Sequence, residues 1–215
     1  MKKLNKRIEF KIAADGSSAS GKTTGGKIIA NKFKMKFLSS GALYRFCAFK
    51  SLENRNTYNV KFINKIANSI TLKKLQNKKL FNPEVAKLSS IIAKKPYVRK
   101  ALKGFQKNFI KKSKLVVVEG RDIGSKIMPN ADLKLFFTCS TKEKAKRRLK
   151  EFKNLNKNIS LKKVEKALIQ RDKEDTKRKI SPLIMTKNAV LVDTTKLTIK
   201  QMEAKLTNLV KNSIK

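Results

Sequence analysis

One eight-residue segment constrains this chain more than any other. Residues 16–23 read Gly-Ser-Ser-Ala-Ser-Gly-Lys-Thr, which fits the pattern G-x-x-x-x-G-K-[ST]. An apolar, β-prone run at 8–14 precedes the segment, and a helix-prone run at 27–33 follows it. A loop in this setting cradles phosphate, because its backbone N–H groups converge on the phosphate oxygens and the following helix directs its positive N-terminus at the anion. The alternative, a flexible Ser/Gly turn that binds nothing, does not account for the flanking strand and helix patterns.

The motif assigns a role to individual positions. Lys22 is expected to reach the β- and γ-phosphates of a nucleoside triphosphate, and the Thr23 hydroxyl is expected to hold Mg²⁺. The residues expected to surround the triphosphate are Gly16, Ser17, Ser18, Ala19, Ser20, Gly21, Lys22, Thr23 and Thr24.

Composition limits the classes of function. The 215 residues give room for one α/β domain with an ample core. No stretch approaches the roughly 20 apolar residues that a membrane span needs, and no signal-peptide pattern follows the basic N-terminus, so a cytoplasmic protein without a membrane partner is expected. The chain has no histidine, which excludes histidine-based catalysis and His-ligated zinc. Cys47 and Cys139 are expected to be buried thiols.

The charge pattern argues against a specific nucleic-acid partner. A net charge of +39 would ordinarily indicate nucleic-acid binding. However, 45 of the 54 basic residues are lysines, and they are scattered along every predicted helix and loop. This pattern predicts a solvated basic coat with salt-sensitive, non-specific attraction to polyanions. The nine arginines are more informative, because a planar guanidinium suits phosphate and carboxylate recognition.

Strand and helix patterns alternate along the chain. The apolar runs at 115–118 and 190–192 favour strands that are buried on both faces of a parallel sheet. The predicted strands are 8–14, 36–39, 115–119, 133–138 and 189–193. The predicted helices are roughly 23–34, 42–54, 59–68, 83–93, 97–112, 141–153, 160–176 and 198–213. This alternation predicts a doubly wound α/β sheet with ligands at the carboxyl ends of the strands.

Two segments have no clear assignment from the pattern. Residues 69–82 alternate loosely and are expected to form a small hairpin insertion. Gly25 and Gly26 fall in the first turn of a predicted helix, where each costs about 1 kcal/mol relative to Ala. Two explanations for these glycines remain open: the helix packs closely against a neighbouring strand, or the loop before it moves.

Four further clusters predict a second anionic ligand. They are the segments 40–45 (Ser-Gly-Ala-Leu-Tyr-Arg), 96–99 (Pro-Tyr-Val-Arg) and 119–122 (Glu-Gly-Arg-Asp), and the set Arg171, Asp175 and Arg178. The i, i+4, i+7 spacing of that set places its three side chains on one face if the helix continues through 178. Each cluster alone is also compatible with a surface salt bridge or a turn. Together, at the edge of a sheet that carries a phosphate loop, they indicate one site.

These segments together resemble the bacterial cytidylate kinases, within the nucleoside monophosphate (NMP) kinase group. The resemblance runs over nearly the whole chain and extends to 129–134, 181–183 and 192–195. Its most specific part is Gly-Arg-Asp-Ile-Gly at 120–124 combined with R-D-x-x-D-x-x-R at 171–178. The phosphate loop by itself is not specific to this family.

The resemblance implies a fold and an activity. The expected fold is a P-loop NTPase-type three-layer α/β/α architecture with a five-stranded parallel sheet. A single domain would span 1–215, with a core at 8–54 and 113–215, an NMP-binding region at about 55–112 and a helical lid at about 145–160. The implied reaction transfers the γ-phosphate of ATP to CMP or dCMP with Mg²⁺, and we expect a monomer.

The resemblance also implies roles for individual residues. The implied catalytic residues are Lys22, Arg121, Asp122 and Arg178. The implied phosphate clamp on CMP consists of Arg45, Arg121 and Arg178. The ribose hydroxyls would be bound by Asp175, supported by Arg171. The implied cytosine-reading residues are Ser40, Ser90, Arg99 and Asp122. The lid over ATP would carry Arg147 and Arg148.

The chain departs from the family pattern at three places. The family usually has an acidic residue at Ser39, where it helps to order Mg²⁺. The phosphate loop usually carries Pro and Gly where this chain has Ser17 and Ala19. The insertion at 69–82 is shortened, so fewer contacts to the acceptor are expected from it.

Two other functions are weighed against this one. The first is a broader UMP/CMP kinase or another small-molecule kinase on the same scaffold, which comparison of acceptors would reveal. The second is a basic nucleic-acid-binding protein that uses its phosphate loop as a switch. That protein would bind a defined RNA at physiological salt without acceptor-dependent ADP release. The chain lacks the aromatic-rich basic stripe typical of such proteins.

Overall fold

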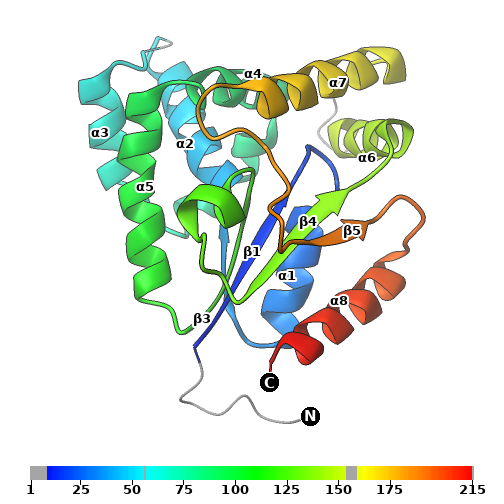
Figure 1. Ribbon diagram of the computed structural model, residues 1–215. Coiled ribbons are helices and arrows are strands. Elements are labelled where there is room, and N and C mark those ends of the chain that lie inside the picture. Colours follow the sequence, from blue (N-terminus) through cyan, green and yellow to red (C-terminus); the bar gives the residue numbers. More distant parts are fainter. Residues whose placement is uncertain (1–8, 56, 154–158, 215) are drawn as a thin grey trace.

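A five-stranded parallel sheet organises the chain. The computed structural model describes residues 9–55, 57–153 and 159–214, and the strand order is β2-β3-β1-β4-β5 (Figure 1). The strands are β1 (Phe10–Gly16), β2 (Lys36–Ser39), β3 (Leu115–Gly120), β4 (Leu133–Thr138) and β5 (Val190–Asp193). Every neighbouring pair is parallel. The predicted α/β fold class is therefore confirmed. Residue 8 of the first predicted strand lies outside the described residues.

Helices connect the strands, and local sequence signals account for where several of them begin. The α-helices are α1 (Lys22–Lys32), α2 (Ser40–Glu53), α3 (Val60–Asn68), α4 (Pro83–Ile92), α5 (Pro96–Lys111), α6 (Thr141–Lys153), α7 (Leu161–Lys177) and α8 (Ile199–Ser213), and a π-helical turn spans Ile123–Ile127 after β3. Asn59, Asn82, Ser160 and Thr198 each cap a helix by accepting a hydrogen bond from a backbone N–H of the first turn. None of the helices in the described ranges is both long and apolar enough to cross a membrane.

The sheet separates two hydrophobic layers. Val116 and Val118 of β3 pack into a core with α2, α3, α4 and α5. Val117 points to the opposite face and packs with α1 and α8. Because successive strand residues face opposite sides, one apolar strand supplies both cores. The result is the three-layer arrangement seen in Figure 1.

Two helices form a separate unit over the carboxyl ends of the strands. α6 and α7 pack against each other through a small cluster of Ala145, Val164 and Leu168. Figure 1 shows this pair near the end of the sheet toward which β1 and β4 run. Residues 154–158 of the predicted lid lie outside the described residues.

The predicted hairpin at 69–82 is wrong. The segment contains two short 3₁₀ helices, at Lys74–Gln76 and Lys78–Phe81. Leu75 and Leu80 are buried against the α2 side of the core, which anchors the turns. The Asn77 side chain caps the second turn by accepting from the N–H of Lys79 at 2.9 Å. The loose alternation in sequence therefore reflects two anchored turns, and no strand pair forms here.

Close packing explains the two glycines at the start of α1. A Cβ added at Gly25 would lie 2.7 Å from Cε1 of Phe137 on β4. A Cβ added at Gly26 would lie 2.8 Å from Cε2 of Phe37 on β2. A side chain at either position would displace an aromatic ring of the sheet, so the glycines let helix α1 pack closely against it.

We expect Gly25→Ala to destabilise the protein by roughly 1–2 kcal/mol, because the clash with the buried Phe137 ring outweighs the gain in helix propensity. Gly104→Ala is the matched control, since Gly104 is exposed on α5 and a Cβ added there would have nothing within 4 Å. That substitution should stabilise by up to about 1 kcal/mol. Urea unfolding of both variants measures the difference, and a Gly25→Ala protein as stable as the parent would contradict the packing explanation.

Candidate active site

The phosphate loop joins β1 to α1 through unusual backbone conformations. Gly16 has φ 154°, and a Cβ there would lie 2.3 Å from the Phe137 carbonyl oxygen. Gly21, the N-cap of α1, has φ 84°. Ala19 has φ 57°, a left-handed conformation that costs an L-residue about 1–2 kcal/mol. The loop borders a cavity of about 750 Å³, large enough for a nucleotide.

Lys22 lies buried at the base of this cavity. Its Nζ donates to the Ser17 carbonyl oxygen at 3.0 Å and lies 3.9 Å from a Glu119 carboxylate oxygen. Burial, reinforced by the Arg121 charge, lowers the pKa of Lys22 to about 7. A bound polyphosphate would reverse this shift, because a nearby anion favours the charged ammonium.

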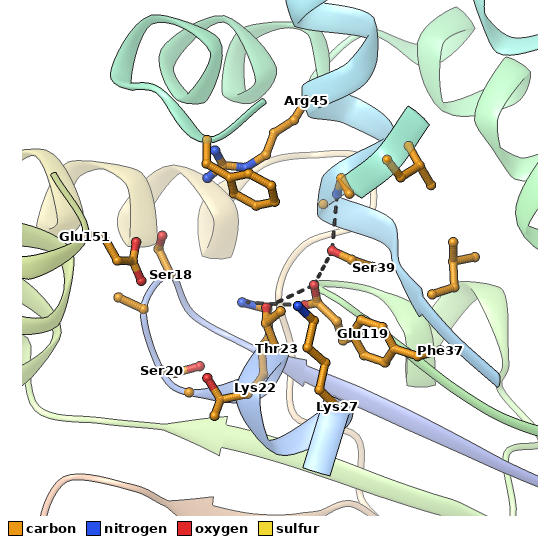
Figure 2. Close-up of a pocket in the computed structure, with 18 of the residues that line it drawn as sticks. Ser18, Ser20, Lys22, Thr23, Lys27, Phe37, Ser39, Arg45, Glu119 and Glu151 are labelled. Carbon is orange, nitrogen blue, oxygen red and sulfur yellow. Dashed lines mark hydrogen bonds and ion pairs between the residues drawn. The ribbon is translucent and has the colours of Figure 1, made fainter. Parts of the chain in front are cut away.

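Glu119 is a site residue that the sequence prediction did not assign. One of its carboxylate oxygens accepts a hydrogen bond from Thr23 Oγ1 at 3.1 Å and another from Ser39 Oγ (Figure 2). Ser39 Oγ also accepts from the Ala42 N–H at 3.2 Å, which caps α2. The available signal was a single acidic residue directly after the apolar run at 115–118, at the carboxyl end of a strand buried on both faces.

The oxygen atoms at this point suit Mg²⁺. The Thr23 and Ser39 hydroxyls and the Glu119 carboxylate are hard ligands, which Mg²⁺ prefers. Within the described ranges, no group of three or more His, Cys, Asp or Glu residues is placed to hold a metal. A magnesium ion would therefore depend on hydroxyls, water and the nucleotide's own phosphates for most of its ligands.

The α6–α7 pair contacts the phosphate loop directly. Arg148 donates to Ser18 Oγ at 3.0 Å, and Arg147 donates to both Oγ1 and O of Thr194 at 2.9 and 2.8 Å. Asp172 on α7 accepts from the Ser18 N–H at 3.3 Å. The two arginines predicted to lie over the nucleotide therefore border the large cavity, as does Glu151.

A second, smaller hollow of about 60 Å³ lies beside the first. Its lining includes eight of the nine residues predicted to bind the acceptor: Ser40, Ser90, Arg99, Arg121, Asp122, Arg171, Asp175 and Arg178. Arg45, the ninth, lines the large cavity instead, and Arg121 lines both. The structure therefore brings together residues from distant segments of the chain at the carboxyl end of the sheet.

Asp175 joins two of the arginines. Its carboxylate accepts from Arg121 Nε at 2.7 Å and from Arg178 Nη1 at 3.1 Å. Burial by itself would raise the pKa of Asp175, but the guanidinium groups of Arg121, Arg171 and Arg178 hold it below its usual value. The expected support from Arg171 is thus electrostatic, and the direct hydrogen bonds come from the other two arginines. Arg178 also lies just past the end of α7, where Nε donates to the Ser181 carbonyl at 2.6 Å, so the expected continuous helical face ends at Lys177.

Two buried guanidinium nitrogens are suited to bind an anion. Arg171 Nε and Arg178 Nη2 have no hydrogen-bond partner in the part of the chain that the structure describes. Buried donors are almost always paired, and an unpaired one costs free energy. Four guanidinium groups also face only two carboxylates in this hollow. A phosphate group would satisfy both the donors and the charge.

The far side of the hollow carries polar groups suited to a nucleobase. Arg99 Nη1 lies 2.9 Å from an Asp122 carboxylate oxygen, and Arg99 Nε donates to the Ala93 carbonyl at 2.8 Å. Ser90 Oγ donates to the Ala86 carbonyl at 3.2 Å. Both Arg99 and Asp122 are thereby held at fixed positions before any ligand arrives.

The segment at 72–81 contributes to the large cavity despite its short length. Arg45 Nη1 donates to the Leu80 carbonyl at 3.0 Å, and its guanidinium lies 5.2 Å from the Phe81 ring centre. Figure 2 shows Arg45 across the cavity from Lys22. The two turns thus hold Arg45 in place. The cavity wall also includes Leu72, Leu75, Gln76, Lys78 and Phe81.

Asp15 ties the two halves of the site together. Its carboxylate accepts from the N–H groups of Ile123 and Gly124 at 2.8 and 2.7 Å. Burial raises the pKa of Asp15 to about 6, although the two backbone hydrogen bonds oppose this shift. Asp15 precedes the phosphate loop and Ile123 follows Asp122, so the Asp15 side chain connects the phosphate loop to the loop after β3.

The class of protein that this site defines is the P-loop kinases. The site combines a phosphate loop on a parallel sheet with a neighbouring arginine-rich hollow, and Arg121 lines both the hollow and the large cavity. Solved structures agree on the fold: a shikimate kinase from Bacteroides thetaiotaomicron has a TM-score of 0.51 and 14% identity, with 95% of this chain and 98% of that chain covered. The cytidylate kinase family model matches residues 12–212. The chain belongs to the cytidylate kinase family.

Curated relatives agree with that assignment. A protein named cytidylate kinase from Rickettsia rickettsii (strain Sheila Smith) is 37% identical over 206 residues, which cover 95% of this chain and 93% of the relative. A cytidylate kinase from Thermosipho africanus is 37% identical over 211 residues and covers 93% of this chain and 94% of the relative.

Binding of MgATP at pH 8 should be accompanied by uptake of nearly one proton, because Lys22 is mostly neutral there in the free protein and the triphosphate raises its pKa. Titration calorimetry in two buffers of different ionisation enthalpy measures this uptake. At pH 6, where Lys22 is already charged, the uptake should be small. Equal heats in both buffers at pH 8 would contradict the shifted pKa of Lys22.

Proposed function

We propose that this protein transfers the γ-phosphate of ATP to CMP or dCMP, yielding ADP and CDP or dCDP. The observation that carries the proposal is the pair of adjoining cavities that share Arg121, one beside the phosphate loop and one with unsatisfied buried guanidinium groups. Membership of the cytidylate kinase family supports CMP as the acceptor. No general base is required, because phosphoryl transfer through a loose transition state depends on positioning and charge.

The donor nucleotide would lie in the larger cavity. We propose that the backbone N–H groups of 16–24 and the Lys22 ammonium bind its phosphates, with Arg147 and Arg148 closing over it from α6. The contacts of these arginines with Thr194 and Ser18 support that placement. Closure of the α6–α7 pair would exclude water, which would otherwise compete with the acceptor for the γ-phosphate.

The acceptor nucleotide would bind against the residues that line the smaller hollow and extend toward Lys22. At about 60 Å³ the hollow is smaller than a nucleotide, so these side chains would move apart as the acceptor enters. We propose that Arg45, Arg121 and Arg178 clamp its phosphate, and that Asp175 binds the ribose hydroxyls with Arg171 beside it. Cytosine would be read by Ser40, Ser90, Arg99 and Asp122. A carboxylate at Asp122 accepts from an exocyclic amine, which cytosine has and uracil lacks.

Magnesium would be held at Thr23. The Glu119 carboxylate and the Ser39 hydroxyl lie beside the Thr23 hydroxyl, and their oxygens fit this ion. When bound, the ion supplies charge stabilisation on the transferring phosphate oxygens. We also propose that residues 1–215 act as one domain, with an NMP-binding region at about 55–112 and a lid at about 145–160, and that the enzyme works as a cytoplasmic monomer.

ADP release measured with CMP, dCMP, UMP and AMP, each with and without Mg²⁺, tests the proposed function. We expect CMP and dCMP to support turnover in a Mg²⁺-dependent manner, because Asp122 needs an amine donor and the transferring phosphate needs a divalent cation. Equal rates with UMP would indicate a broader acceptor range. Absence of acceptor-dependent ADP release would overturn the kinase assignment.

Arg178→Ala should lower kcat by about 10²–10³-fold, because the variant loses a guanidinium directed at the transferring phosphate. ATP affinity should remain nearly unchanged, since Arg178 lines the smaller hollow and not the larger cavity. Steady-state kinetics and ATP titration measure the two effects. Arg55→Ala, at an exposed arginine outside both cavities, is the matched control and should behave like the parent. Turnover within a few-fold of the parent would refute the role given to Arg178.

A further inference from the structure

A buried hydrogen bond links α5 to the first residue of α2. Gln106 Nε2 donates to Ser40 Oγ at 2.7 Å. Gln106 is 2% exposed and Ser40 is 3% exposed, so water does not compete for this contact. Ser40 lines the smaller hollow next to Asp122, whereas Gln106 lies behind it and is not part of the lining.

This hydrogen bond uses the Ser40 oxygen as an acceptor. A serine hydroxyl has one proton to donate and two lone pairs that accept. The Gln106 amide occupies a lone pair, so the proton is free to point elsewhere. Since Ser40 borders the hollow, the hydroxyl presents a hydrogen-bond donor to a molecule bound there.

We propose that Gln106 is a positioning residue that makes the enzyme prefer cytosine to uracil by holding Ser40 as a donor. This inference rests on the proposed function. Cytosine has an acceptor, the ring nitrogen N3, next to its exocyclic amine, whereas uracil carries a hydrogen on that nitrogen. With Asp122 accepting from the amine, Ser40 donates to N3 of cytosine. The same hydroxyl opposes the N3 hydrogen of uracil, because two donors then face each other.

The packing of α5 does not account for Gln106. Val98 and Leu102 on the same helix are fully buried and anchor it to the core. Burying an amide among apolar side chains costs free energy unless the amide is hydrogen-bonded. An apolar residue at this position would pack equally well. The amide of Gln106 is therefore best explained by its hydrogen bond to Ser40.

The test replaces Gln106 with methionine, which has a similar shape and cannot donate. We expect Gln106→Met to lower the ratio of kcat/KM for CMP to kcat/KM for UMP by about tenfold, because Ser40 can then rotate to accept from uracil. Gln106→Glu should lower the ratio at least as far, since a carboxylate draws the Ser40 proton away from the hollow. Leu102→Ala is the control for a purely structural effect and should destabilise the protein without changing the ratio.

The Ser40→Ala background shows whether Gln106 acts through Ser40. There, Gln106→Met should change the ratio no further, and an undiminished effect would overturn the proposal. Binding of 3-deaza-CMP, in which a C–H group replaces N3, gives a measurement on the parent protein alone. We expect it to bind about tenfold more weakly than CMP. Equal binding of the two nucleotides would overturn the proposal even if a variant failed to fold.

The outcomes separate this inference from the proposed function. A parent enzyme that phosphorylates CMP, combined with an unchanged ratio in Gln106→Met, overturns the role of Gln106 and leaves the kinase assignment standing. A parent without acceptor-dependent ADP release overturns both.

Discussion

The arginine-rich hollow depends on one carboxylate placed among several guanidinium groups. Asp175 accepts hydrogen bonds from Arg121 and Arg178, which come from different parts of the chain. In a chain of net charge +39, guanidinium groups would otherwise repel one another and turn toward solvent. Asp175 offsets part of that repulsion and leaves two nitrogens, on Arg171 and Arg178, for an incoming anion. This arrangement supports the proposed binding of a phosphate group in the hollow.

Two other carboxylates connect separate segments near the phosphate loop, with hydroxyl and backbone N–H groups as their partners. Glu119 accepts from Thr23 and Ser39, and Asp15 accepts from backbone N–H groups beyond Asp122. Each carboxylate connects the carboxyl end of one strand to a neighbouring element. Because parallel strands end at one edge, these contacts unite the phosphate loop, the start of α2 and the loop after β3 into one rigid frame. The α6–α7 pair is joined to this frame through side chains, by Asp172 with the Ser18 N–H, Arg148 with the Ser18 hydroxyl and Asp175 with Arg121.

Much of the fold could be predicted from local patterns. Apolar runs predicted the five strands, and the predicted helix ranges correspond to α1–α8. The segment at 69–82 was predicted wrongly, because the burial of Leu75 and Leu80 that holds its two turns depends on α2, which lies far away in the sequence. For Gly25, the sequence left two explanations open, and the Phe137 ring that decides between them comes from β4.

The sequence by itself determined which functional groups the protein has for chemistry. These are a phosphate loop and arginines at specific motif positions, and the chain has no histidine. Those properties reside in residue types and short spacings, which folding does not alter. Only the tertiary structure decided which groups meet, including the pairing of Asp175 with Arg121 and the contact of Gln106 with Ser40. Such contacts depend on the positions of the helices on the sheet. Those positions are determined by side-chain packing between segments that are distant in the sequence, which local patterns do not reveal.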